Sequence, residues 1–369
     1  MNYSKVGSVE AIALIVVIIL NHIVLDLPNH FLNTCGNSAP LNIIFISILV
    51  FVFLYVVLKL FKNFAGYDIL DISEFLGGKT LKVVIGTLFI AYFTLLCSTQ
   101  LRNFGEMLKI VYFPKLPICL LVLLFLGVGI ISNKFGANTI FKGNLIVVPL
   151  AMINLLIAYF CISFRFVPEK IFPILGYGAN KTFVSGMTNI FAFTGIAYIY
   201  FLQPILKKSN NFKKISFIGI GISSLYLFLS ITSLLFSFSD VLSINEISPI
   251  YLLIRAADFG RFIKRPDAIF FLGWILCLMS YTSITILLIS QIFKKTCNLK
   301  ARFPICYAIS SILFIVALIP KGMLEIRFIE NDIYKYFTLI LVFLISFLIL
   351  LFANIKYKKH EMERDLVNE

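Results

Sequence analysis

Charged residues are scarce in this chain, and their scarcity decides its class. Of the 369 residues, 14% are charged and 60% are hydrophobic. A soluble domain usually has about 25% charged residues, so too few are present to cover a globule of this length. The apolar excess must therefore face lipid. The sequence predicts an all-α integral membrane protein without an independent soluble domain.

The usual signatures of catalysis and metal binding are missing as well. The seven cysteines are scattered singly and form no CxxC pair, so neither a zinc site nor a redox motif is expected. We find no nucleophile motif, no P-loop and no paired carboxylates within an apolar run. The histidines, His22, His30 and His360, lack metal-ligand spacing. We expect no enzyme activity, no cofactor and no metal.

Ten apolar runs approach the length of about 20 residues that a helix needs to cross a bilayer. They are Val9–Leu27, Leu41–Leu58, Val83–Leu101, Leu116–Ile131, Leu145–Phe164, Phe183–Leu206, Ile215–Phe238, Ala268–Phe293, Phe303–Pro320 and Tyr336–Ile355. The third run could extend to about Val111. A cleaved signal peptide is the alternative for the first run, but no small-x-small site follows it. We interpret residues 1–369 as one transmembrane domain with halves at about 9–164 and 183–355 and a tail at 356–369.

The basic residues indicate orientation rather than nucleic acid binding. The net charge is +14, but the lysines and arginines do not form one patch. They gather in short clusters between the apolar runs, as is typical of cytosolic loops. The dense clusters lie at 59–62, 79–82, 134–142, 207–214 and 294–302 and in the tail. This alternation predicts that both termini are cytosolic.

Two loops have helical patterns of their own. Within Gly66–Gly78, Asp68, Asp71 and Glu74 recur every three residues opposite apolar side chains, which predicts a short helix along the cytosolic interface. The outer segment Ser239–Asp267 is long for a loop and contains a second helical stretch, Pro249–Phe262. Loops of this length usually have a function, such as that of a lid.

Polar residues interrupt the first and sixth runs. The first ends with Asn21, His22 and Asp26 just before Pro28, and the sixth has Gly195 in its middle. Interrupted helices in corresponding positions of two halves indicate a central binding site in transporters. Alternatively, the end of the first run lies at the outer interface, and Gly195 serves ordinary helix packing.

Hydroxyl groups offer further ligand-binding candidates in the third and eighth runs. They could coordinate an ion or a small zwitterion, although such groups also commonly bond to their own helix. The third run has Tyr92, Thr94, Ser98, Thr99 and Gln100, and the eighth has Trp274, Ser280, Tyr281, Thr282, Ser283 and Thr285. From all four runs we select a set of candidate ligand-binding residues: Asn21, His22, Tyr92, Ser98, Phe191, Phe193, Thr194, Gly195, Tyr198, Tyr281 and Thr282.

Several stretches together resemble a known family. They are Gly66–Gly78 continuing to Glu106, Val167–Gly176, Phe191–Gly195 with Pro204, and Arg265–Phe270 leading to Trp274. In their order and spacing, the chain resembles the permease-like B subunit of bacterial spore germinant receptors, within the amino acid–polyamine–organocation superfamily. The resemblance implies a leucine-transporter-like fold of five-plus-five inverted repeats, with a small-molecule site between broken helices 1 and 6, lined by helices 3 and 8.

The resemblance also implies partners and a location. In such receptors the B subunit works with a membrane-anchored A subunit and a lipoprotein C subunit in the spore inner membrane, and a nutrient, commonly an amino acid, triggers germination. This chain departs from the family pattern at two places. Asn21 and His22 stand where members often have glycine, and Ala197 stands where many have an acidic residue. The identity of the ligand therefore stays open.

Two other functions are compatible with such a fold, because fold does not determine function. One is an amino acid transporter coupled to protons or sodium, which needs a titratable or ion-coordinating group at its centre; His22, Asp26 and the hydroxyls of the eighth run are the candidates. The other is a channel. For the receptor, we expect amides at the broken helix ends to hold a carboxylate and closure to shift the Asp68–Glu74 helix against the A subunit.

Overall fold

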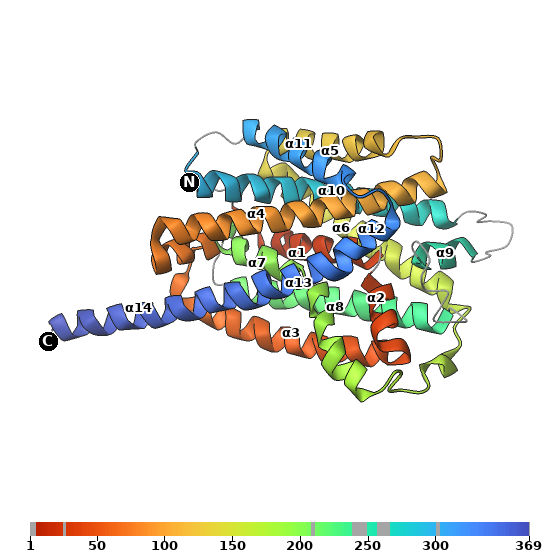
Figure 1. Cartoon of the computed structure of the whole chain (residues 1–369), viewed down its shortest axis with the longest axis horizontal. Coiled ribbons are helices and arrows are strands. Elements are labelled where there is room, and N and C mark those ends of the chain that lie inside the picture. Colours follow the sequence, from red (N-terminus) through yellow and green to blue (C-terminus); the bar gives the residue numbers. More distant parts are fainter. Residues whose placement is uncertain are drawn as a thin grey trace.

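The protein is a bundle of helices, many of them long. The computed structural model describes residues 5–24, 27–207, 211–237, 249–256, 266–299 and 303–368. Within these ranges the only β-pairing is an isolated parallel bridge between Val6 and Leu206. Both chain ends lie at the same end of the bundle (Figure 1).

The first half follows the predicted runs closely. Its helices are α1 (Ser8–Val24), α2 (Leu27–Cys35), η1 (Gly36–Ser38), α3 (Ala39–Phe61), η2 (Lys62–Phe64), α4 (Ile69–Val111), α5 (Ile118–Phe135) and α6 (Ala137–Ser163). The predicted break in the first run separates α1 from α2, and the third helix does extend to Val111. Leu25 and Asp26, between α1 and α2, lie outside the described residues.

The second half contains short and bent elements. It consists of η3 (Pro168–Ile171), η4 (Asn180–Val184), η5 (Ser185–Ala192), α7 (Gly195–Leu202), η6 (Gln203–Ile205), α8 (Phe212–Ser237), α9 (Pro249–Ala256), α10 (Pro266–Thr296), α11 (Phe303–Leu318), α12 (Met323–Phe328), η9 (Ile329–Tyr334), α13 (Lys335–Thr338), η10 (Leu339–Ile345) and α14 (Ser346–Asn368). Of the predicted helix Pro249–Phe262, the described part forms α9, and residues 257–265 lie outside the description.

The tenth helix begins earlier than its hydropathy suggests. We expected it to start at Tyr336, but helical segments follow one another without interruption from Met323 to Asn368. The apolar run misled the prediction because Glu325, Arg327 and Glu330 make the first turns polar.

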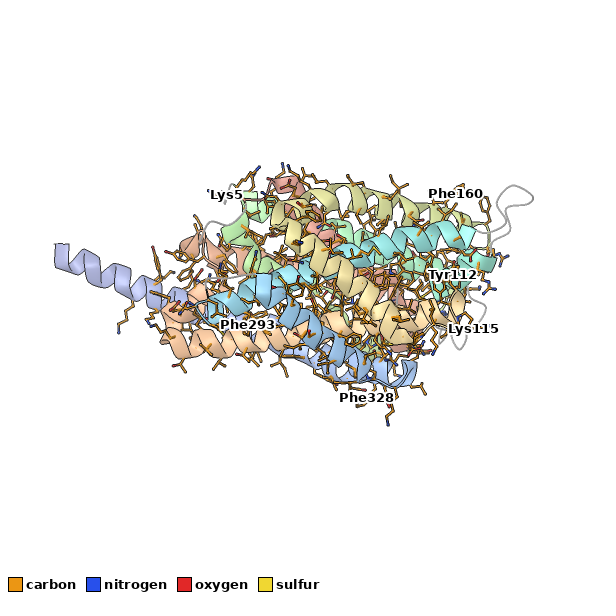
Figure 2. All side chains as sticks on the ribbon, turned by 90° about the horizontal axis from the view of Figure 1, so that it is seen from above. Lys5, Tyr112, Lys115, Phe160, Phe293 and Phe328 are labelled. Carbon is orange, nitrogen blue, oxygen red and sulfur yellow. The ribbon has the colours of Figure 1, made fainter. Side chains whose placement is uncertain are left out.

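Seven helices of the described part are long and apolar enough to cross a membrane, and the bent pair Asn180–Ala192 and Gly195–Ile205 raises this number to as many as eight. The first and ninth runs form the shorter apolar helices Ser8–Ile23 and Ile305–Leu318. Each of the ten predicted runs thus coincides with one of these helices. Lys5 and Phe293 lie toward one end of the bundle, and Tyr112, Lys115 and Phe160 toward the other (Figure 2), which agrees with the predicted alternation of loops.

α1 lies at the centre of the bundle and packs against α6, α7, α8 and α10 (Figure 1). Most of its apolar side chains are buried. By contrast, peripheral helices expose apolar stripes. On α6 the exposed residues recur every three or four positions, as Ile146, Leu150, Ile153, Ile157 and Phe160, which places them on one helical face. Such a stripe is suited to lipid rather than water.

The short helix predicted within Gly66–Gly78 is the start of α4. Asp68 caps it: its carboxylate accepts hydrogen bonds from the amides of Leu70 and Asp71, and the Asp71 side chain accepts from the Asp68 amide. Gly77 and Gly78 then leave helical geometry, with Gly78 at a φ of +71°, a conformation that glycine adopts without strain. A short helical segment therefore precedes a break, and the long spanning part follows.

Candidate functional site

A cavity lies between the two broken helices. Its volume is about 30 Å³, which is room for one or two water molecules. The lining residues come from α1, α2, α4, η5, the break before α7, and η9: His22, Leu27, His30, Thr99, Gln100, Phe191, Thr194, Glu330, Asn331 and Tyr334. An amino acid would need more space than this cavity offers.

Gln100 of α4 is the centre of the polar contacts around this cavity. Its amide nitrogen lies 2.7 Å from Nδ1 of His22, and its carbonyl oxygen accepts a hydrogen bond from Asn21 at 3.3 Å. The same nitrogen is 3.5 Å from a carboxylate oxygen of Glu330. One side chain thus connects the end of α1 to η9. Because the amide donates to Nδ1, the neutral His22 ring carries its proton on Nε2.

Several buried polar atoms around the cavity have no hydrogen-bond partner among the described residues. They are Oδ1 of Asn21, Nε2 of His22, Nε2 of His30, the hydroxyl of Thr194 and the hydroxyl of Tyr281. Asn21, His22 and Thr194 are each less than 5% exposed. A buried polar group without a partner costs about 1–3 kcal/mol. These atoms lie on both broken helices, so they are available to hydrogen-bond with a polar group placed between them.

The break in the sixth helix lies at Phe193 and Thr194. The helical segments on its two sides, Asn180–Ala192 and Gly195–Ile205, are bent by 51°. Gly195 begins α7, and a Cβ there would lie 2.8 Å from Cδ1 of Ile19. This glycine therefore allows α1 to approach closely. The two interpretations of Gly195 from the sequence are therefore compatible, because this glycine lies at the break and also lets two helices pack closely.

The amides after this break are not all available to a ligand. The amide of Ile196 donates to the Phe193 carbonyl, and that of Ala197 donates to the Thr194 carbonyl. The expectation that this broken end offers free amides is therefore wrong for these two groups. The first turn of α2 also lines the cavity, through Leu27 and His30, although its second residue, Pro28, has no amide hydrogen to offer.

The structure brings part of the predicted set together. His22, Phe191 and Thr194 line the cavity. Three others stand one contact away: Asn21 reaches it through Gln100, Tyr281 packs its ring against His22 at 5.7 Å, and the Tyr92 hydroxyl lies 3.5 Å from that of Tyr334.

The rest of the predicted set serves packing. Ser98 donates to the carbonyl of Leu313, Thr282 donates to that of Leu278, and Tyr198 shares a hydrogen bond with Thr285. Phe193 is buried at the helix break, and Gly195 contacts Ile19. None of the five lines the cavity. Whether any of the eleven binds a ligand stays a prediction, but the structure places the tenth helix, and not the eighth, in the wall.

Residues of the tenth helix were missed, as was His30. Glu330, Asn331 and Tyr334 precede the apolar run that marked this helix, so hydropathy gave no sign of them. A signal was present, however, because Glu330 and Tyr334 are four residues apart and therefore share a helical face. The His22 and Tyr334 rings stack with centroids 6.3 Å apart, which joins the first and tenth helices.

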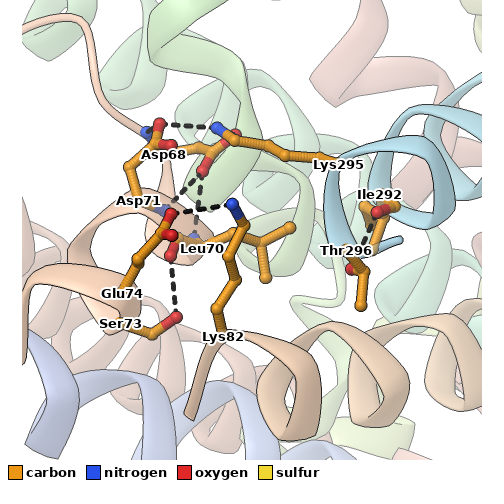
Figure 3. A network of polar contacts seen from close by, with 9 residues as sticks. All are labelled: Asp68, Leu70, Asp71, Ser73, Glu74, Lys82, Ile292, Lys295 and Thr296. Atoms are coloured by element: carbon orange, nitrogen blue, oxygen red, sulfur yellow. Dashed lines mark hydrogen bonds and ion pairs between the residues drawn. The ribbon is translucent and has the colours of Figure 1, made fainter. Parts of the chain in front are cut away.

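A second polar network lies at the start of α4 (Figure 3). Lys295, near the end of α10, is 2.6 Å from a carboxylate oxygen of Asp68 and 2.5 Å from one of Asp71. Lys82 pairs with Glu74 across the break at Gly77 and Gly78, at 2.7 Å. Burial raises the pKa of the Asp68 carboxyl, and the Lys295 ammonium opposes that rise. We expected one interfacial polar stripe, but Asp68 is only 4% exposed and acts as a helix cap and ion-pair partner.

The described residues contain no group of three or more histidine, cysteine, aspartate or glutamate side chains that could hold a metal ion. The polar groups around the cavity are instead two imidazoles, amides, hydroxyls and one carboxylate. This set suits a small organic ligand with both charged and hydrogen-bonding groups.

Comparison with solved structures places the fold. A structure of MhsT in complex with L-phenylalanine aligns with a TM-score of 0.67 at 12% identity, covering 96% of this chain and 100% of that one. Mhp1 in a closed conformation with bromovinylhydantoin bound aligns with a TM-score of 0.65 at 10% identity, covering 96% and 90%. The fold is therefore the expected leucine-transporter-like membrane fold.

Comparison of sequences places the family. Residues 5–326 match the family model described as spore germination protein. Spore germination protein B2 of Bacillus subtilis (strain 168) is 24% identical over 325 residues, covering 86% of this chain and 85% of that protein. Spore germination protein GerQB of Bacillus cereus is 24% identical over 274 residues, covering 73% and 74%. The resemblance seen in the sequence is confirmed, and the chain belongs to the family of permease-like spore germination proteins.

Proposed function

We propose that this chain is the nutrient-sensing membrane subunit of a spore germinant receptor, and that it binds an amino acid between its two broken helices. The observation that carries the proposal is a set of polar atoms of His22, Thr194 and Asn21 around one small cavity, none of which has a partner among the described residues. A ligand that satisfied them would offset their desolvation cost.

The arrangement of charge around the cavity favours a zwitterion. The start of α2 lines one part of the wall, and a helix N-terminus favours a carboxylate. Nε2 of His22 would donate to the same group. Glu330 lines another part, where its carboxylate would hold an ammonium group. Phe191, which is buried and packs its ring edge against His30 at 5.0 Å, would contact the ligand's side chain.

Ligand binding must open this space, because about 30 Å³ does not hold an amino acid. α10 offers a route for the signal. It carries Tyr281 against His22 and, fourteen residues later, Lys295 against Asp68 and Asp71, a separation of about 21 Å along a helix. A displacement at His22 would thus reach the start of α4. In this proposal the start of α4 faces the cytosol, both termini are cytosolic, and a receptor A subunit docks there, with a C subunit completing the complex in the spore inner membrane.

The first test is germination of spores that lack the gene, scored by dipicolinate release against a panel of amino acids. Loss of the response to one nutrient, restored by the wild-type gene, would support the receptor role and name the ligand. An unchanged response to the whole panel would contradict it. Uptake of labelled amino acids into proteoliposomes would then test the transporter alternative.

A further inference from the structure

A second space lies between the end of α3 and the start of α8. Its volume is about 450 Å³, far larger than the central cavity. Residues that line it include Tyr55, Lys59, Lys62, Gln203, Phe212 and Lys213. We call this space the α3–α8 cleft. α3 ends at the end of the bundle where both termini lie (Figure 1), which is the end that the basic clusters mark as cytosolic.

The α3–α8 cleft concentrates positive charge without a counter-charge. Lys59, Lys62 and Lys213 are exposed, and none of the three forms an ion pair with a described residue. The ammonium of Lys213 lies 5.0 Å from the centre of the Tyr55 ring. Three cations around one concave space attract an anion.

Buried contacts hold the walls of the cleft in place. The rings of Phe61 and Phe212 meet edge to face with centroids 5.7 Å apart, joining α3 to α8. Gln203 is 5% exposed. In the amide orientation that satisfies its neighbours, its nitrogen lies 3.0 Å from the carbonyls of both Phe64 and Tyr67. These hydrogen bonds fix the turn that follows Lys62. Together with the Phe61–Phe212 contact, they hold in place the backbone that carries the three lysines.

An apolar stripe leads away from the cleft along α3. Ile48, Val52 and Tyr55 are each at least 50% exposed, and their spacing of four and three residues continues to Lys59 and Lys62 on the same helical face. A soluble anion would use only the lysines. A phospholipid would use both parts, with its phosphate at the lysines and an acyl chain along the stripe.

We propose that the α3–α8 cleft binds the headgroup of an anionic phospholipid. Basic pockets between membrane helices on the cytosolic side recognise such headgroups. The lipid would join α3 to α8, and this site is separate from the nutrient cavity. It can therefore be right or wrong independently of the proposed ligand.

The test is lipid binding by the purified full-length chain, measured by native mass spectrometry with phosphatidylglycerol or phosphatidylcholine added. We expect a preference for phosphatidylglycerol. In the triple variant Lys59→Gln, Lys62→Gln, Lys213→Gln, the affinity of the protein for phosphatidylglycerol should fall about a hundredfold. Each lysine near an anionic headgroup contributes about fivefold to this affinity. The matched control Lys79→Gln, Lys207→Gln, Lys214→Gln removes the same charge from exposed lysines outside the lining and should keep the preference.

Three results would overturn the proposal. One is an unchanged affinity for phosphatidylglycerol in the first triple variant. Another is an equal loss in the control, which would assign the effect to net charge rather than to the cleft. The third is displacement of the lipid by inorganic phosphate at the same concentration, which would make the cleft a site for a free anion. Unchanged thermal unfolding temperatures of both variants without added lipid would show that neither has lost its fold.

Discussion

The side-chain amide of Gln100 donates to Nδ1 of His22 across 2.7 Å, and through this bond the third helix orients the end of the first. Because Nδ1 accepts this bond, the ring proton lies on Nε2, which has no partner among the described residues and can donate to an acceptor. Gln100 thus positions His22, although the sequence analysis named it only among the polar residues of the third run and did not select it.

Replacing Gln100 with leucine should therefore harm both stability and sensing. Gln100→Leu leaves the amide of Asn21 and Nδ1 of His22 buried without partners, which costs about 3 kcal/mol. The thermal unfolding temperature of the purified protein should fall, and spores should need more nutrient to germinate. Ser98→Ala is the matched control on the same helix, since Ser98 bonds the Leu313 carbonyl outside the cavity. An equal loss of sensitivity in that control would contradict the assignment.

Glu330 should determine recognition of an ammonium group. Glu330→Gln keeps the shape of the side chain and removes its charge, so the response to the cognate amino acid should weaken about tenfold to a hundredfold. The response to the matching carboxylic acid without the amino group should change little. Glu325→Gln, in an exposed side chain that accepts from the Lys321 amide, is the control. Equal weakening for both ligands would count against a zwitterion.

Gly195→Ala tests the close approach of the two broken helices. The added Cβ would lie 2.8 Å from Cδ1 of Ile19, and overpacking of this kind costs about 1–3 kcal/mol. Adding Ile19→Val removes the clashing methyl group, so the double variant should unfold at a higher temperature than the sum of the two single effects predicts. Additive effects would mean that Gly195 is required for another reason.

Lys295→Met tests the ion pairs at the start of α4. Removing one partner of a buried ion pair costs about 3 kcal/mol or more, so the unfolding temperature should fall clearly. Adding Asp68→Asn and Asp71→Asn should restore part of it, because no uncompensated charge then remains. Lys294→Met is the control, because Lys294 forms no ion pair with a described residue. A loss in the control as large as in Lys295→Met would argue against a specific role for the pair.

Hydropathy and spacing were sufficient for the ten apolar helices, apart from the start of the tenth, and for both breaks. Residue patterns located the broken first and sixth helices because a polar cluster before a proline and a glycine in mid-run are local signals. The short helix before Gly77 was also predicted from a local pattern. The burial of its cap residue, Asp68, could not be predicted in this way, because its partner Lys295 is distant in the sequence.

The wall of the cavity could not be predicted in the same way. Which face of a helix is turned toward a site depends on the rotation of the helix about its axis and on its packing against segments distant in the sequence. Thr282 and Ser98 have suitable chemistry but point to backbone carbonyls. Glu330 and Tyr334 lie in a polar stretch that hydropathy placed outside the membrane helix, and only the three-dimensional arrangement brings them to His22.

The most direct test of a ligand site between the broken helices is the germination dose response of spores carrying Thr194→Val. The hydroxyl of Thr194 has no hydrogen-bond partner among the described residues, and valine has nearly the same shape, so the fold should be unaffected. The half-effective nutrient concentration should rise about fivefold, the worth of one hydrogen bond, with the maximal response unchanged. Thr282→Val, whose hydroxyl bonds its own helix, should leave the curve in place. Identical curves for wild type and Thr194→Val would contradict the account.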